Sequence, residues 1–295
     1  MGASEDLSIC TACGTQFDVQ RQQDPTNCRI CDDPRQFVPP SGQSWTSLKE
    51  MQGKYKNEWK QDDVEERMWS IWTEPKFGIG QRAILLQTPG GNVLWDLIAF
   101  LDEKTVNFIN SKGGLEAIVI SHPHYYTTHL EWAERFNCPV YISAEDEIWL
   151  NREDDAKNSR RRYIEGTTET ILDGVTAVKT GGHFPGSLVL HWDEKLFIAD
   201  TFVTVPSALY HVDRLPGTTS YAFMWSIPNM LSLPPTEMHK MWSALKPFDF
   251  TSTHGAFVGL DVRDMKVKGR VLESMKIQTM HEGYEKHELL DETWD

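Results

Sequence analysis

Histidines cluster directly after a short apolar run in the first half of the chain. Residues 118–120 are Ile-Val-Ile, and His122, His124 and His129 follow closely. Residues 130–136 space their apolar side chains as a helix does, so the histidines lie where a strand gives way to a helix. Ligands collect beyond strand ends in open α/β sheets, and neutral imidazoles suit zinc. The pattern predicts a metal site, although any one of these histidines alone could be an ordinary surface residue.

Three later stretches carry a histidine or an aspartate in a similar setting. His183 lies in the glycine turn Gly-Gly-His-Phe-Pro-Gly-Ser, and Asp200 ends the apolar run Phe-Ile-Ala-Asp. His254 follows residues 248–253 within Ser-Thr-His-Gly. A rigid scaffold can hold a ligand on loops of this kind. These stretches strengthen the prediction of a metal centre.

Residues 69–259, in which these histidine and aspartate motifs follow one another in this order, resemble the metallo-β-lactamase superfamily. The His-Pro-His of residues 122–124 matches the first half of the superfamily's His-x-His-x-Asp-His signature, and His183, Asp200 and His254 match its later ligands. The resemblance implies an α/β fold of four layers, the αββα sandwich. The alternation of strands and helices alone predicts only a mixed α/β domain.

The resemblance also implies which residues would hold the metal. We assign His122, His124 and His183 as the nitrogen ligands of one ion. Asp200 is expected as a further ligand, which could orient the metal-bound hydroxide or take up its proton. His254 is expected as an additional ligand or as a hydrogen-bond donor to substrate. The expected ion is zinc, with iron or manganese as alternatives.

The sequence departs from the signature at two positions. The signature's aspartate falls on Tyr126 and its last histidine falls on Thr127. These positions normally help to hold a second metal, and tyrosine and threonine are poor replacements. We therefore do not expect a second catalytic metal. His129, one helical turn beyond Tyr126, is the residue that could partly compensate.

Two further residues are expected to support the chemistry. Asp96, in Leu-Trp-Asp, resembles the strand-end aspartate of the superfamily and could support a histidine ring. Its alternative is a solvated turn carboxylate. Tyr126 could donate its phenol to a developing oxyanion, with packing under the helix as the alternative.

The predicted activity is that of a metal-dependent hydrolase using a metal-bound hydroxide on a small ester, thioester, lactone or lactam. Residues 201–235 are rich in aromatic side chains and could line an apolar pocket for such a substrate. The pocket residues expected are Tyr221, Phe223 and Trp225, with core packing as the alternative. Two other functions stay open: a mononuclear iron oxidoreductase resembling sulfur dioxygenases, and a degenerate binding scaffold without catalysis.

Four of the five cysteines form two Cys-x-x-Cys pairs, Cys10 with Cys13 and Cys28 with Cys31. In a chain without a secretion signal, this spacing indicates zinc before disulfides, in a closed structural site of the zinc-ribbon type. Residues 1–35 have few large apolar side chains, so the metal must supply their folding energy. Such a unit could also recruit a protein partner.

The organisation expected from these patterns has two parts. Residues 1–45 form the four-cysteine unit and its linker, and residues 46–295 form the metallo-β-lactamase-like domain with a helical C-terminal tail. Within the domain, residues 83–88 and 93–96 flank Pro-Gly-Gly-Asn and are expected to form a β-hairpin. Residues 102–111 are expected to form a helix.

Composition limits the choice of partner and compartment. The formal net charge is −14, from 29 basic and 43 acidic residues, which disfavours nucleic acid and favours a small-molecule substrate. No apolar run is long enough to span a membrane. The first residues lack the basic and apolar parts of a signal peptide, so we expect a cytoplasmic protein without membrane contact.

Overall fold

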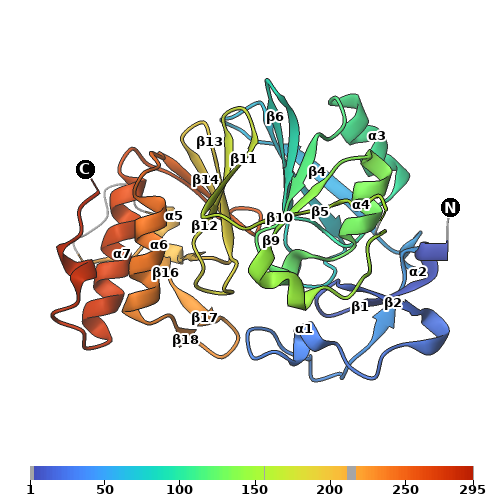
Figure 1. The fold of residues 1–295 in the computed structure, drawn as a ribbon, viewed down its shortest axis with the longest axis horizontal. Coiled ribbons are helices and arrows are strands. Elements are labelled where there is room, and N and C mark those ends of the chain that lie inside the picture. Colours follow the sequence, from blue (N-terminus) through green and yellow to red (C-terminus); the bar gives the residue numbers. More distant parts are fainter. Residues whose placement is uncertain (1–2, 156, 211–216, 295) are drawn as a thin grey trace. The chain divides into compact units, whose positions relative to one another are not determined.

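The computed structural model describes residues 3–155, 157–210 and 217–294, and Figure 1 shows their fold. The chain divides into two compact units, Met1–Ile164 and Glu165–Asp295. Each unit is built around its own β-sheet and is described by itself. The boundary predicted at residue 45 stays a prediction.

The first unit begins with a small three-stranded antiparallel sheet in the order β2-β1-β3. Its strands are β1 (Leu7–Cys10), β2 (Gln16–Gln20) and β3 (Trp45–Thr46). The short helices around it are η1 (Ala3–Asp6), η2 (Arg21–Gln23), α1 (Arg29–Asp32) and α2 (Leu48–Met51). Ile9 of β1 is fully buried in a cluster with Phe77, Ala99 and Phe100 from later parts of the unit. This small sheet is therefore packed against the rest of its unit.

A seven-stranded sheet forms the main part of the first unit, in the order β10-β9-β8-β7-β6-β5-β4. Its strands are β4 (Lys56–Gln61), β5 (Met68–Glu74), β6 (Ala83–Thr88), β7 (Gly91–Trp95), β8 (Ala117–Val119), β9 (Val140–Ser143) and β10 (Arg161–Ile164). Strands β4 to β7 are antiparallel, and β7 to β10 are parallel. The predicted hairpin is confirmed as β6 and β7, which pair in register from Ile84 with Trp95 to Thr88 with Gly91.

Parallel strands need crossover connections, and two helices provide them. Helix α3 (Glu103–Ser111) joins β7 to β8, and α4 (His129–Phe136) joins β8 to β9, on the same side of the sheet (Figure 1). Asp102 caps α3 by accepting a hydrogen bond from the Thr105 amide at 2.8 Å. Helix α4 ends at Asn137, which takes the left-handed conformation that terminates many helices. The predicted helix at 102–111 is confirmed.

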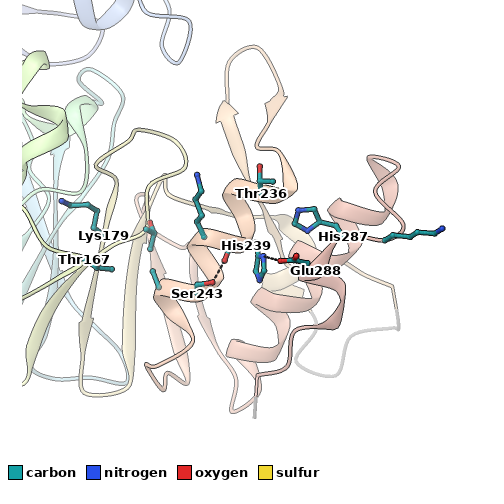
Figure 2. Close-up of a pocket in the computed structure, with 11 residues that line it drawn as sticks. Thr167, Lys179, Thr236, His239, Ser243, His287 and Glu288 are labelled. Carbon is teal, nitrogen blue, oxygen red and sulfur yellow. Dashed lines mark hydrogen bonds and ion pairs between the residues drawn. The ribbon is translucent and has the colours of Figure 1, made fainter.

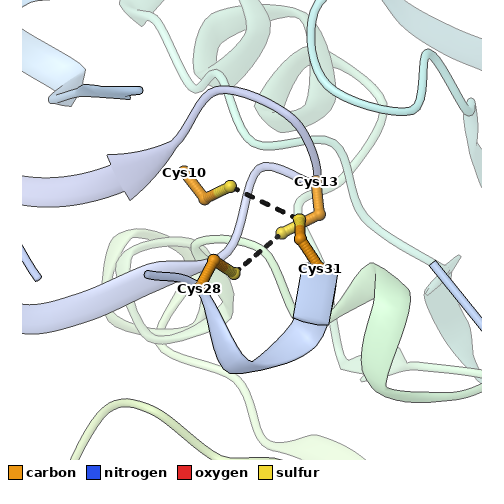
Figure 3. Close-up of side chains that lie close together, drawn as sticks. All are labelled: Cys10, Cys13, Cys28 and Cys31. Carbon is orange, nitrogen blue, oxygen red and sulfur yellow. Dashed lines mark hydrogen bonds between the residues drawn. The ribbon is translucent and has the colours of Figure 1, made fainter. Parts of the chain in front are cut away.

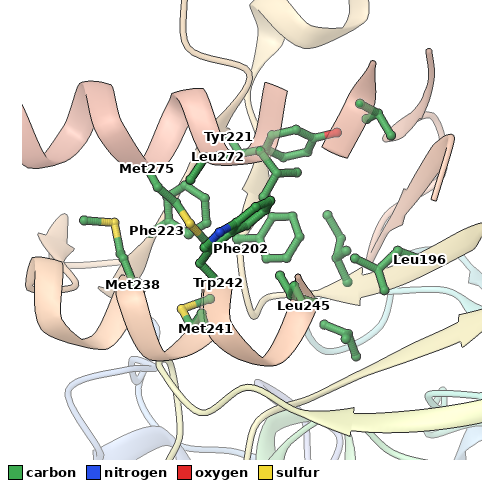
Figure 4. Close-up of a cluster of buried hydrophobic side chains, with 14 of the residues drawn as sticks. Leu196, Phe202, Tyr221, Phe223, Met238, Met241, Trp242, Leu245, Leu272 and Met275 are labelled. Atoms are coloured by element: carbon green, nitrogen blue, oxygen red, sulfur yellow. The ribbon is translucent and has the colours of Figure 1, made fainter. Parts of the chain in front are cut away.

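The second unit contains a six-stranded sheet in the order β11-β12-β13-β14-β19-β20. Its strands are β11 (Thr168–Leu172), β12 (Val175–Lys179), β13 (Leu188–Trp192), β14 (Lys195–Ala199), β19 (Ser252–Gly255) and β20 (Asp261–Arg263). Its main helices are α6 (Pro235–Leu245) and α7 (Val267–His281). Trp242 of α6 and Met275 of α7 are fully buried in one apolar cluster, which Figure 4 shows between the two helices and the sheet. Burial of such side chains contributes about 1.5–3 kcal/mol each.

Shorter elements complete the two units. They are η3 (Pro123–Tyr125), η4 (Ala144–Trp149), β15 (Val203–Thr204), α5 (Pro206–Tyr210), β16 (Tyr221–Ala222), β17 (Met224–Ser226), β18 (Leu231–Ser232) and η5 (Glu288–Asp291). Residues 211–216 of the predicted aromatic stretch lie outside the described residues. Within the described ranges, no helix has the length and apolar character needed to cross a membrane. Each unit combines a sheet with flanking helices, so the predicted mixed α/β class is confirmed.

Candidate metal centres

The four paired cysteines converge in the first unit. Cys10 ends β1, Cys13 follows it in a tight turn, and Cys28 and Cys31 lie at the start and within α1 (Figure 3). All four are buried, and their sulfur atoms lie within 4.8 Å of one another. The Sγ atoms of Cys10 and Cys31 are 3.6 Å apart, and those of Cys13 and Cys28 are 3.7 Å apart. These spacings are too long for disulfide bonds.

The cysteine cluster fits a tetrahedral metal ion. Zn–S bonds of ~2.3 Å imply sulfur–sulfur edges of roughly 3.8 Å, close to the observed spacings. Hydrogen bonds from Cys13, Cys28 and Cys31 lower the pKa of Cys10, and Gln43 adds one through its side-chain amide at 3.2 Å. Burial raises the pKa of Cys13. A divalent ion bound by the four sulfur atoms would stabilise the thiolate form of all four cysteines.

The histidine pair of the first unit lies beyond the end of β8. His122 and His124 are both buried, and each offers a ring nitrogen within 4.8 Å of the other's. The turn η3 between them begins at Pro123, whose fixed φ suits the start of a helical turn. The Ser121 hydroxyl lies 2.8 Å from His122 Nδ1 and orients this ring. Two buried imidazoles in this arrangement are suited to a metal ion.

Asp96 supports the histidine pair through the backbone. It follows β7 with a left-handed φ of 55°, and its carboxylate accepts a hydrogen bond from the Ser121 amide at 2.7 Å. Its own amide donates to the Val119 carbonyl at 2.9 Å. Asp96 is buried, so the alternative of a solvated turn carboxylate does not hold. This hydrogen bond holds the backbone of Ser121, the residue before His122, whereas the predicted support was to a histidine ring.

The two positions that depart from the signature are occupied by buried side chains. The Tyr126 hydroxyl donates to the Asp146 carbonyl at 3.2 Å, and burial holds its pKa well above the usual value for tyrosine. The Tyr126 hydroxyl is thus engaged with the main chain. Its predicted role as an oxyanion donor stays a prediction. Thr127 has a left-handed φ of 38°, which is strained for a β-branched residue and costs about 1–3 kcal/mol.

His129 begins helix α4 and has hydrogen bonds at both ring nitrogens. Its Nδ1 donates to the Tyr126 carbonyl at 2.9 Å, and its Nε2 accepts from Arg161 Nε at 3.0 Å. Burial and the neighbouring Arg161 lower its pKa to about 3. His129 is thus a neutral side chain with structural partners, and among the described residues it is not part of a group of potential metal ligands. Its predicted role in a second metal site stays a prediction.

The second unit carries a histidine–aspartate pair. His183 and Asp200 are buried, and their ligand atoms lie within 4.8 Å of each other. His183 follows Gly182, whose φ is 92° and where a Cβ would lie 2.9 Å from Met241 Sδ. Only glycine fits this close approach, which explains the Gly-Gly-His sequence. His183 Nδ1 donates to the Trp225 carbonyl at 2.9 Å, which leaves Nε2 as the unprotonated nitrogen.

His254 of β19 lies in a different setting in the same unit. Its Nδ1 is 2.8 Å from the Asp261 carboxylate, and its Nε2 is 3.1 Å from the Ser252 hydroxyl. Among the described residues it is outside the group of potential ligands that includes His183 and Asp200. The sequence offered no sign of the Asp261 contact, because that residue comes from the neighbouring strand β20. The predicted ligand or donor role of His254 stays a prediction.

The three residues predicted to line a substrate pocket have different environments. Tyr221 and Phe223 are buried in the core of the second unit, and the Tyr221 hydroxyl is 2.7 Å from the Thr253 hydroxyl. Their burial supports the alternative of core packing. Trp225 is partly exposed and provides the carbonyl that binds His183. Of the three, Trp225 therefore fits the predicted pocket best.

A separate cavity of about 840 Å³ lies in the second unit, beside α6 and η5 (Figure 2). Neither His183 nor Asp200 lines it. It contains several basic side chains, but Lys240 pairs with Glu237 at 2.8 Å and His239 pairs with Glu292 at 2.9 Å. These pairs reduce its net positive charge, and we assign it no ligand.

Comparisons with known proteins agree with the fold. Two structures similar to this chain are VMB-1, with a TM-score of 0.56 and 12% identity, and the metallo-β-lactamase DIM-1, with 0.55 and 13%. They cover 77% and 76% of this chain, and 99% and 98% of their own. The metallo-β-lactamase FIM-1 from Pseudomonas aeruginosa, in its mono-zinc form, has a TM-score of 0.50 and 11% identity over 76% of this chain and 96% of its own.

These likenesses define the class: the chain has the metallo-β-lactamase fold predicted from the sequence, and each unit carries a buried pair of potential metal ligands. No family model matches the chain. It is 39% identical over 251 residues to the uncharacterized protein YmaE of Bacillus subtilis (strain 168), which covers 84% of this chain and 88% of YmaE. The chain thus belongs to the family of YmaE and has the metallo-β-lactamase fold.

Proposed function

We propose that this protein is a metal-dependent hydrolase whose catalytic ion is held by His122, His124, His183 and Asp200. The observation that carries the proposal is the presence of two buried donor pairs, one in each unit, each with its ligand atoms within 4.8 Å. Both pairs match the metal positions that the resemblance to the superfamily implies. Imidazole and carboxylate form a donor set typical of catalytic zinc. The cysteine cluster is proposed to hold a separate, structural zinc.

A zinc ion with an open position would supply a nucleophile at neutral pH, by lowering the pKa of bound water, and would polarise a carbonyl. The residues around it have separate tasks. His183 is held in one tautomer by the Trp225 carbonyl, so that it offers a lone pair. Asp200 could accept the proton released from water and return it to the leaving group. Burial of both residues excludes bulk water and strengthens these interactions.

The proposed substrate is a small ester, thioester, lactone or lactam. The net charge of −14 disfavours a polyanionic substrate such as nucleic acid. Trp225 offers partly exposed aromatic surface next to a proposed ligand, which suits an apolar group on the substrate.

One catalytic metal is proposed instead of two. The second site of the signature would use positions 126 and 127, where the Tyr126 hydroxyl donates to a backbone carbonyl and Thr127 offers no ionisable group. His129 uses both ring nitrogens in hydrogen bonds within its own unit. FIM-1 has been crystallised in a mono-zinc form, an example of this fold with one zinc.

An oxidoreductase with one iron ion is the second candidate. The observation that favours it is the same reduced ligand set, because three histidines and one carboxylate also suit iron. Metal analysis separates the two activities. Zinc with hydrolysis of a chromogenic ester or lactam supports the hydrolase, and iron with oxygen uptake supports the oxidoreductase.

The test of the proposed function is metal content measured after purification without added metal. The unchanged protein is expected to hold two ions per chain, one at the cysteines and one at the histidines. His124→Ala is expected to hold one and to lose hydrolysis, whereas His191→Ala, a control remote from the ligand pairs, keeps both. A chain that holds metal only at the cysteines would refute the hydrolase and support the degenerate scaffold.

A further inference from the structure

Resting on the proposed function, we infer that the four-cysteine unit positions the metal-binding histidines. The elements concerned are the cysteine knuckle, residues 10–16, and the histidine loop, residues 121–129. Both belong to the first unit. Metal bound by the cysteines thereby increases the affinity of the histidines for their own ion.

A backbone hydrogen bond joins the knuckle to the loop. The Gln16 amide donates to the Thr127 carbonyl at 3.1 Å. Gln16 is three residues beyond Cys13, and Thr127 is three residues beyond His124. Few rotatable bonds therefore separate a cysteine ligand from a histidine ligand. Thr127 has a left-handed backbone, which needs such support from its surroundings.

Close packing reinforces this hydrogen bond. Gly14, with a φ of 83°, lies so near the loop that a Cβ would be 3.0 Å from Ala99 Cβ and 3.6 Å from Thr127 Cγ2. The Ala99 carbonyl accepts a hydrogen bond from the Thr128 hydroxyl at 2.7 Å. The knuckle and the loop therefore share one packing partner, Ala99. A shift of the knuckle would displace Ala99 and, through it, the loop.

A second connection runs through two arginines. Arg152 pairs with Asp18 at 2.6 Å and with Glu131 of α4 at 3.0 Å, and it also bonds to the Gln16 side chain. The carbonyl of Arg152 accepts from Arg161, which in turn donates to His129. This network fixes the start of α4 relative to the strand that follows the knuckle.

The cysteine ligands determine whether this framework is ordered. Gly14 directly follows Cys13, and its amide donates to the Cys10 carbonyl at 2.8 Å, which closes the turn that begins at Cys10. A closed four-cysteine metal site is expected to supply much of the folding energy of residues 1–35, in addition to the packing of Ile9 against the rest of the unit. Without it, the knuckle loses its fixed geometry, and the histidine loop loses the Gln16 bond and the Gly14 contact. The cysteine unit therefore influences metal binding by the histidines without contributing a ligand to their ion.

The experiment compares Gly14→Ala with Gly53→Ala in the full chain. Both glycines have a left-handed φ, 83° and 75°, but a Cβ at Gly53 would meet nothing within 4 Å. The two variants share the backbone strain, but only the Cβ at position 14 meets Ala99 closely, and Ala99 in turn hydrogen-bonds to Thr128 of the loop. Cobalt is the probe, because thiolate ligands give charge-transfer absorption that histidine ligands do not. Competition with a chelator gives the affinity of each site, and hydrogen exchange reports on residues 121–129.

Gly14→Ala is expected to weaken cobalt binding at the histidines by about tenfold or more, as supporting contacts of a metal site commonly do. Exchange in the loop should accelerate while cobalt at the cysteines persists, and Gly53→Ala should match the unchanged protein. Equal histidine affinity and equal loop exchange in the two variants would overturn the inference. If Gly14→Ala does not fold, Arg152→Gln with Arg162→Gln as its control provides the same comparison.

One result separates this inference from the proposed function. If the unchanged protein binds cobalt at the cysteines only, the proposed function fails. The positioning is then decided by exchange in residues 121–129 with and without zinc at the cysteines. Slower exchange with zinc supports it, and equal exchange overturns it.

Discussion

The cysteine cluster and the histidine pair of the first unit are both buried groups of potential metal ligands, but they are built differently. The cysteines supply four donors from one short stretch, enough to close a tetrahedral site. The histidine pair supplies two donors from its unit and needs others to hold an ion firmly. A closed site contributes to folding, and an open one leaves room for chemistry.

The largest effect is expected from removing the closed site. Cys10→Ser combined with Cys28→Ser should lose one zinc and disorder residues 1–35, because structural zinc is worth about 10–16 kcal/mol in zinc-finger peptides. Zinc content and hydrogen exchange measure this. Cys138→Ser is the control, since this buried cysteine lies outside the cluster. Equal zinc in the double variant and the unchanged protein would contradict the assignment.

Loss of an open-site ligand should have a narrower effect. His122→Ala or His183→Ala should lose the proposed catalytic ion and activity together, while zinc at the cysteines is retained. The melting temperature of the protein measured without metal should change little. Metal analysis and circular dichroism provide the measurements. A variant that keeps both ions would remove the mutated histidine from the ligand set.

His129 should affect stability instead of metal binding. Its folded pKa of about 3 lies below the ~6.5 of an unfolded histidine, so the unfolded state binds the proton more readily. Stability is therefore lost as pH falls from about 6.5 towards 3, by on the order of several kcal/mol. His129→Gln should flatten this acid limb in denaturant titrations while retaining most of the metal. An unchanged pH dependence would show that folding does not lower the pKa of His129.

The smallest effect is expected at the wall of the open site. Trp225→Ala should weaken binding of an apolar ester by raising KM, with metal content unchanged, because its carbonyl still binds His183. Phe223→Ala is the contrasting variant, since this buried side chain should instead cost about 3–5 kcal/mol of stability. If the two variants behave alike, Trp225 has a packing role only.

The local parts of these sites could be predicted from the sequence. Two Cys-x-x-Cys pairs define their own geometry, and His-Pro-His at a strand end places two rings together. The contacts that hold them could not be predicted, because they join distant residues. Nothing in the sequence around Gln16 or Arg161 indicates Thr127 or His129. The aromatic stretch illustrates the same limit, because burial by α6 and α7, and not composition, made Tyr221 and Phe223 core residues.

The hydrogen bond between Gln16 and Thr127 also has a consequence for biosynthesis. Its two ends are separated by roughly a hundred residues, which a ribosome adds in about 5–20 s at ~5–20 residues per second. The cysteine knuckle therefore leaves the ribosome well before the histidine loop and can acquire its ion during translation. If both proposed ions bind, the cysteine ligands are therefore complete before the histidine ligands have been synthesised, and the cysteine site can be filled first.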